Sequence, residues 1–446
     1  MSHPLLIAPI GRSLFRLAGP TTAVMLVQIL VAVAEAWFIA RVGIDALAGI
    51  ALVIPFTTLM MNMANGGMGG GAASALARAL GGGRHEDARA LVLHALLLGA
   101  ACALVFTVFG WTALPSIFRW MGGTGEALHQ ALAFSYVWFS CAIVQWTVAF
   151  LSALLRGSGN AATPGRIGVA LSLVYIPLLG VLTLGVGDWP GFGLVGGAIA
   201  SPITSAVGIV FYARAIARGR LGFAPSLMGV RLQPRLFIEI LRVGAMGSIT
   251  TVAATLTAML VTGLVGRFGT AALAGYSIGM RLEFMMAPLA FGIGTGATTL
   301  VGIAAGAGDW RRAIRVAWTA GLVAAVAMGL IGWTIASMPQ AWSQLFASDP
   351  DVIAASISCI IHVAPFYCLF GLGLTLNFAS QGAGRMTVPV AASVARLVVA
   401  AFGGWWAVSH GFGLSGVFTA IAASLVVYGG VIAGMLLVVP WRARRR

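Results

Sequence analysis

The chain has 446 residues, of which 60% are hydrophobic and only 8% are charged, and its mean hydropathy is +0.99. A soluble protein carries roughly 25% charged residues because water must solvate its surface, so this composition excludes a soluble globular fold. The formal net charge is +15, and all 26 basic residues are arginine. A nucleic-acid surface would gather basic residues with aromatics on one domain. These arginines are spread along the chain, so we expect no nucleic-acid partner.

Long apolar stretches dominate the chain from its first residues onward. Residues 91–114, 243–266 and 322–338 contain no Asp, Glu, Lys or Arg. A helix needs about 20 mostly apolar residues to cross the hydrocarbon core, so these stretches predict transmembrane helices. No polar stretch is long enough for a separate soluble domain. The sequence predicts an all-α integral membrane protein with 12 transmembrane helices.

The arginines fall mainly on every second predicted loop. The alternate loops hold only Arg41, Arg119 and Arg267, together with most of the loop acids. Loops rich in arginine face the cytoplasm by the positive-inside rule. We therefore expect a multi-pass protein of the cytoplasmic (inner) membrane with an even number of spans and both termini in the cytoplasm, in contact with membrane lipid.

The second half of the chain repeats the first. Residues 156–164 shifted by 225 fall on residues 381–389 with both glycines and the proline in register, and residues 191–194 match 411–414 at a shift of 220. Several matches in one order indicate a duplicated unit. Because a unit of six helices is even, the second unit enters from the same side, and the repeats are parallel. Transporters use such repeats to build a site between two lobes.

The repeat predicts a division of the chain into three parts. We expect a first six-helix lobe at 1–213, a basic cytoplasmic linker at 214–235 and a second six-helix lobe at 236–446. The histidines show no metal-ligand spacing and no ATP-binding motif is present, so we expect no cofactor or metal, only H⁺ or Na⁺ as a coupling ion.

Short motifs recur in order along both halves. They are Gly19-Pro20, Val42-Gly43 with Ala46 to Gly49, Ala77 to Gly83, Arg156 to Asn160, Gly275-Tyr276 with Arg281 to Glu283, and Val301-Gly302 with Gly306 to Gly308. With these motifs the chain resembles the multidrug and toxic compound extrusion family over about residues 14 to 438. The resemblance implies an efflux antiporter of two six-helix lobes, driven by H⁺ or Na⁺, that exports amphipathic organic cations. Related transporters flip lipid-linked sugars.

Glu35 lies inside the first predicted span, between apolar neighbours, and an acid there costs free energy unless it has a function. A carboxyl group in this position can hold a proton or face a cation, but not both tightly, which is what an antiporter requires. Its spacing from Pro20 resembles the family's proline and acidic residue, and Pro20 can bend the helix. The alternative is that Glu35 sits near the outer end and reaches the interface.

Arg281 and Glu283 lie in the eighth predicted span, two residues apart, so they do not share a helix face and each should meet a group on another helix. Glu283 is either a cation-contacting acid or part of a structural ion pair, whereas Arg281 and Arg396 are expected to be structural. Residues 248–266 and 352–378 contain no carboxylate, unlike the sodium-binding branch of the family. Proton coupling through Glu35 is therefore favoured over sodium.

A cavity for the substrate would need polar and aromatic side chains within the spans. We expect Gln28, Asn62, Tyr276 and Asn377 to line it together with Glu283 and Arg281, although helix-to-helix hydrogen bonding is a simpler role for each. Two competing functions are a flippase for a lipid-linked intermediate, which would need a larger arginine-lined cavity, and an intramembrane enzyme, which would need a nucleophile or a His–acid pair. We expect no enzyme, and a monomer that binds a small molecule.

Overall fold

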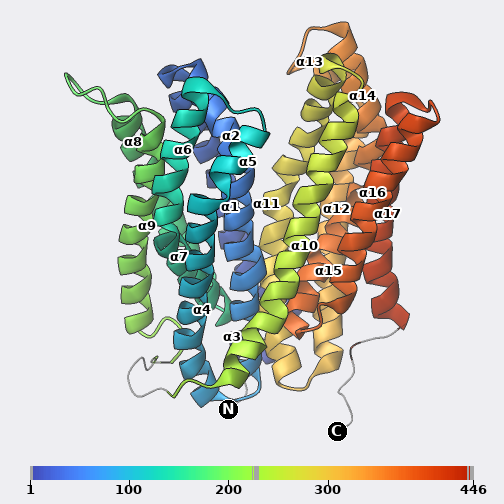
Figure 1. The fold of residues 1–446 in the computed structure, drawn as a ribbon. Helices are drawn as coiled ribbons and strands as arrows, with labels where there is room; N and C mark the ends of the chain where they lie inside the picture. The colour runs from blue at the N-terminus through green and yellow to red at the C-terminus, as the bar shows by residue number, and fades with distance from the viewer. Residues whose placement is uncertain (1–3, 224, 226–230, 439–440, 442–446) are drawn as a thin grey trace.

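The computed structural model describes residues 4–223, 225, 231–438 and 441. Within these ranges all the regular elements are helices (Figure 1). Eleven helices are long and apolar enough to cross a membrane, and a twelfth crossing is made by two helices, Gly125–Ser140 and Ala142–Gly157, which meet at an angle of 51°. The predicted all-α fold with 12 transmembrane crossings in two halves is confirmed.

The first half contains six crossings. Its elements are η1 (Pro4–Leu6), α1 (Ile10–Val42), α2 (Ile44–Asn62), the π-helical segment η2 (Met63–Met68), α3 (Gly69–Gly81), α4 (His85–Thr112), α5 (Leu114–Trp120), α6 (Gly125–Ser140), α7 (Ala142–Gly157), α8 (Ala162–Leu184) and α9 (Leu194–Ala217). The second crossing is one continuous span, Ile44–Gly81, made of α2, η2 and α3.

The second half repeats this plan. Its elements are α10 (Pro234–Gly266), α11 (Thr270–Gly306), α12 (Trp310–Ser337), α13 (Pro339–Gln344), α14 (Pro350–Val363), the 3₁₀ turn η3 (Ala364–Phe366), α15 (Tyr367–Ala383), α16 (Thr387–Ser409) and α17 (Gly413–Val438). The expected linker at 214–235 overlaps the end of α9 and the start of α10, and its residues 224 and 226–230 lie outside the described part of the chain.

The fourth and tenth crossings are interrupted at equivalent positions. The first interruption is at Cys141, between α6 and α7, and the second is at η3, which ends 225 residues later at Phe366. Pro365 explains the second one, since proline lacks the amide donor that a continuous helix needs. The repeat thus reproduces the place of a break as well as the helices themselves.

Each half has its own buried apolar core, and Figure 1 shows the two groups of helices side by side. Helices α2 to α9 contribute most of the first core, and helices α10 to α17 contribute most of the second. The start of α1 is an exception, because its Leu14, Leu17 and Ala18 are buried in the second core. Helix α1 therefore contacts both lobes.

The two lobes meet on one side of the membrane, which we call the arginine-rich side and which carries the loops 82–84, 158–161, 307–309 and 384–386. Here α3 packs directly on α10 and α11 through glycines. A Cβ atom on Gly71 would lie 2.7 Å from the backbone nitrogen of Gly244, and one on Gly302 would lie 2.8 Å from the Cβ of Ala77. Such backbone approach is possible only where side chains are absent or small.

Ion pairs reinforce the contact on the arginine-rich side. Glu239 of α10 lies 3.4 Å from Arg78 of α3 and 3.5 Å from Arg84, and Asp87 of α4 pairs with Arg235 of α10. The hydrogen bonds between the lobes, among the described residues, lie either at the middle of the spans or on this same side. One example is the bond that the Ser74 hydroxyl donates to the backbone carbonyl of Gln381. The lobes are therefore closed against each other on the arginine-rich side.

Candidate functional site

A cavity lies among the membrane-spanning helices of each lobe. The first-lobe cavity has a volume of about 530 Å³ and is lined by α1, α2, α7, α8 and α9. The second-lobe cavity has a volume of about 490 Å³ and is lined mainly by α10, α11, α15, α16 and α17. Met25, Asn62 and Asn65 line both cavities, so the two spaces border each other where α2 enters its π-helical segment.

Glu35 lines the first-lobe cavity and its carboxylate accepts a hydrogen bond from the hydroxyl of Tyr175 on α8. Tyr175 is only 8% exposed. About two turns before Glu35 on α1, the side-chain amide of Gln28 donates a hydrogen bond to the hydroxyl of Ser172 over 3.2 Å. The Glu35 side chain thus points toward α8 and the cavity instead of reaching along α1 to the membrane interface.

The contact between α1 and α8 depends on glycines opposite Pro20. A Cβ atom on Gly165 would lie 2.7 Å from the Cβ of Pro20, and one on Gly168 would lie 3.1 Å from a methyl group of Val24. Pro20 lies within α1 with its ring against α8. The two glycines let α8 come close enough for Tyr175 to reach Glu35.

The first-lobe cavity also contains an arginine that was not among the residues predicted to line a cavity. Arg156 belongs to the last turn of α7 and lines the cavity. Its Nη1 donates to the Ser152 hydroxyl over 2.6 Å, and no carboxylate forms an ion pair with it among the described residues. The cavity therefore offers a carboxylate and a guanidinium group.

The second-lobe cavity contains the equivalent combination of one acid and one arginine. Arg396 of α16 lies 3.8 Å from the carboxylate of Glu283 on α11. The guanidinium group also lies over two rings, with its Cζ 4.8 Å from the centroid of Phe370 and 5.6 Å from that of Tyr428. Its Nε is buried and has no hydrogen-bond partner in the described structure. This position combines cation–π contacts with a free donor.

Most of the residues predicted to line a cavity do so. Gln28 lies in the first cavity, Asn62 lies in both, and Tyr276, Asn377 and Glu283 lie in the second. Asn377 donates to the Tyr428 hydroxyl over 3.1 Å, and Tyr276 stacks on Phe418, so these side chains also join helices.

The assignment of Arg281 to the cavity was wrong. Arg281 is exposed and its guanidinium lies 4.6 Å from the ring centroid of Phe346, which follows α13. Two residues along a helix correspond to about 200°, so Arg281 and Glu283 point to opposite sides of α11. Glu283 meets Arg396 on another helix, as predicted, and it is Arg396 that lines the cavity.

Comparison with known proteins gives consistent results along the whole chain. The model of the MatE family matches residues 20–181 and 248–406, which is one match in each lobe. A probable multidrug resistance protein NorM of Deinococcus radiodurans is 29% identical over 96% of this chain and 95% of its own length. A probable multidrug resistance protein NorM of Thermotoga maritima is 26% identical, and an FAD transporter of Shewanella oneidensis is 22% identical, each over 85% of this chain and more than four fifths of its own length.

Solved structures share the fold at low sequence identity. A multidrug resistance MATE family transporter in an outward-facing conformation superposes with a TM-score of 0.89 at 23% identity, and the match covers 98% of this chain and 97% of the other. A transporter of Pyrococcus furiosus, described as having reversed polarity in its binding pocket, gives the same TM-score and identity over 97% of both chains. The family model covers more than half of the chain and its two matches coincide with the two lobes. The chain therefore belongs to the MatE family of multidrug and toxic compound extrusion transporters.

Proposed function

We propose that the chain exports amphipathic, cationic small molecules across the cytoplasmic membrane in exchange for protons, by alternating access between its two lobes. Glu35 carries this proposal, because it is the carboxylate that lines the first-lobe cavity. When Glu35 is ionised, the Tyr175 hydroxyl donates to it, and when Glu35 is protonated, its own hydroxyl can donate to Tyr175. Proton binding therefore changes the cavity's charge without breaking the α1–α8 contact.

The residues that line the two cavities suggest a separate role for each lobe. We assign the coupling proton to Glu35 and the polar end of the substrate to Glu283 and its neighbours, with the aromatic rings of the second-lobe cavity as the apolar wall. The lobes at 1–213 and 236–446 would rock about the linker at 214–235, with the arginine-rich side cytoplasmic. In that orientation the structure represents a state closed to the cytoplasm.

The arginines favour a second candidate, the flipping of a lipid-linked intermediate. Arg156 and Arg396 could each contact a phosphate group, and the substrate of one relative, FAD, also carries phosphates. Each arginine shares its cavity with a glutamate, however, and each cavity has about the volume of a drug-sized site. The cavities therefore suit a small molecule better than a lipid-linked sugar.

Dye transport in proteoliposomes tests the proposal. Ethidium flux would be measured under an imposed proton gradient and, separately, an imposed sodium gradient, for the wild type, Glu35→Gln and the control Glu126→Gln, which neutralises an exposed acid at the start of α6. We expect proton-driven flux that is lost in Glu35→Gln and kept in the control. Sodium-driven flux would overturn proton coupling, and transport of FAD in place of ethidium would overturn the cationic substrate.

A further inference from the structure

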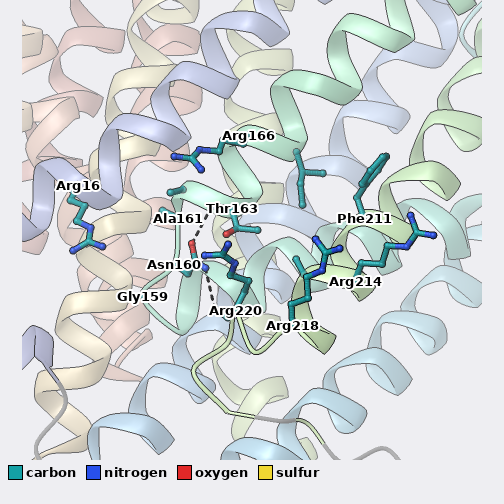
Figure 2. Close-up of a pocket in the computed structure, with 13 residues that line it drawn as sticks. Arg16, Gly159, Asn160, Ala161, Thr163, Arg166, Phe211, Arg214, Arg218 and Arg220 are labelled. Atoms are coloured by element: carbon teal, nitrogen blue, oxygen red, sulfur yellow. Dashed lines mark hydrogen bonds between the residues drawn. The ribbon is translucent and has the colours of Figure 1, made fainter.

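A third pocket lies at the arginine-rich side of the first lobe, and its lining residues differ from those of both cavities. We call it the arginine pocket; its volume is about 700 Å³ (Figure 2). The loop between α7 and α8 forms its floor, and five arginines surround it from α1, α8, α9 and the segment after α9. These are Arg16, Arg166, Arg214, Arg218 and Arg220. The described lining contains no Asp or Glu.

The five guanidinium groups are exposed, and within the described part of the chain none of them takes part in an ion pair. The ion pairs on this side of the membrane use other arginines, such as Arg78 and Arg235. Five like charges around one concave surface repel one another and concentrate a positive potential there. An anion with several acceptor oxygens would relieve this repulsion.

The loop holds its shape through hydrogen bonds that Figure 2 marks. The Asn160 side chain accepts from the backbone of Thr163 over 3.1 Å and donates to the backbone of Arg220 over 3.0 Å. These bonds tie the segment after α9 to the start of α8. The backbone segments that carry Arg166 and Arg220 are therefore held beside the same space.

Orientation in the membrane does not by itself require an arginine at position 166. A bias of arginine toward the cytoplasmic side acts on both lobes, but the residue 225 positions after Arg166 is the exposed Ala391. Arg166 therefore has no counterpart at this spacing in the second lobe.

The surface beside the pocket is suited to acyl chains. Helix α9 lies at the edge of the first lobe in Figure 1 and exposes a row of apolar side chains that ends at the pocket. The row consists of Ile203, Val207, Val210 and Phe211, each between 42% and 49% exposed. Phe211 also lines the arginine pocket, one turn before Arg214. A molecule with a phosphate head and an apolar tail would match both surfaces.

We propose that the arginine pocket binds the phosphate headgroup of an anionic phospholipid from the adjacent leaflet, with its acyl chains along α9. Basic pockets between transmembrane helices on the cytoplasmic side recognise such headgroups through the same charge and hydrogen-bond chemistry. This inference does not depend on the transported substrate, because none of the five arginines lines either cavity.

Binding of lipid to the purified full-length protein in detergent tests the proposal. Phosphatidylglycerol labelled on its acyl chain would be titrated and followed by fluorescence anisotropy, with labelled phosphatidylcholine as the neutral comparison. We expect saturable binding of phosphatidylglycerol at least about tenfold tighter than that of phosphatidylcholine. Removing two of the five charges in Arg166→Ala/Arg214→Ala should weaken phosphatidylglycerol binding roughly 30-fold.

The matched control removes two exposed arginines from the other lobe, Arg311→Ala/Arg315→Ala, and should change binding less than about threefold. The charge-preserving variant Arg166→Lys/Arg214→Lys should keep most of the affinity and shows that the pocket tolerates substitution. Equal losses in both alanine variants, or equal binding of the two lipids, would overturn the proposal. Full displacement of lipid by pyrophosphate at matched ionic strength would reassign the pocket to a free phosphate compound.

Discussion

Glu239 offers a direct test of how the lobes are held together on the arginine-rich side. Its carboxylate, on α10, lies 3.4 Å from Arg78 and 3.5 Å from Arg84 across the lobe interface, and the side chains of Arg78 and Glu239 are 13% and 23% exposed. These pairs exist only while the lobes are closed on this side. Replacing Glu239 with Gln removes the charge and keeps the shape, so the closed arrangement should lose stability relative to an arrangement open on this side.

The size of the effect follows from the burial of each pair. A hydrogen bond to a charged group contributes about 1.5–3 kcal/mol, and the lower end applies because the distances are long. The Arg84 pair adds little, since that side chain is 41% exposed and screened by water. Arg78 also keeps its bonds to Ser74 and the Gly382 carbonyl. A loss of about 1.5 kcal/mol shifts the equilibrium between the two arrangements just over tenfold toward the open one.

Spin labels on the two lobes would measure this shift. Glu86→Cys on α4 and Arg311→Cys on α12 are exposed positions on the arginine-rich side, to be introduced after replacement of the four native cysteines. Double electron–electron resonance should show the longer-distance population growing about tenfold relative to the closed one in Glu239→Gln. The control Glu126→Gln should leave it unchanged. An unaltered distance distribution in Glu239→Gln would refute the assignment of these pairs as a lock.

Three further changes should have measurable effects. Gly71→Ala places a Cβ 2.7 Å from the Gly244 backbone and should cost about 1–3 kcal/mol of the closed arrangement, seen with the same labels, whereas Gly430→Ala meets no atom within 4 Å and should be neutral. Tyr175→Phe removes the donor to Glu35 and should lower proton-driven dye flux several-fold, while an unchanged flux would argue against a role for this bond. Arg396→Ala leaves the partly buried Glu283 without its partner and should lower the melting temperature in detergent, and Glu283→Gln in the same chain should restore part of the loss; no restoration would contradict the pairing.

The crossings and the duplication could be predicted from the sequence because apolar length and spacing depend only on the chain itself. The rotation of each helix about its own axis, which decides the side chains that face a cavity, could not be predicted from the sequence. Arg281 and Arg396 are both arginines within apolar stretches, and only the packing of α11 and α16 decides that Arg396 faces the cavity. Arg156 was not predicted to line a cavity; it lies in the last turn of α7, one residue before the helix ends. Tyr175 was overlooked as a partner of Glu35, although it lies three residues after Ser172 and so shares a helix face with it.

The helix interruptions link the cavities to the contact between the lobes. The π-helical segment η2 starts at Met63, and the residue 225 positions later is Pro288, which lies in α11 and lines the second-lobe cavity. A π-helix and a proline both leave backbone carbonyls without their usual partners. In η2 the Gly66 carbonyl accepts instead from the Gln381 side chain of α15, over 2.8 Å.

Gln381 therefore joins the second lobe to the segment where both cavities meet. It lines the second-lobe cavity, and its backbone carbonyl accepts a hydrogen bond from Ser74 of α3 at the lobe interface. Its Oε1 is buried and has no hydrogen-bond partner among the described residues. Gln381 thus binds the first lobe through both its side-chain nitrogen and its backbone carbonyl. Its side-chain oxygen is left to accept a hydrogen bond from a donor in the cavity. Opening of the lobes on the arginine-rich side would therefore break the hydrogen bonds that Gln381 makes to the first lobe.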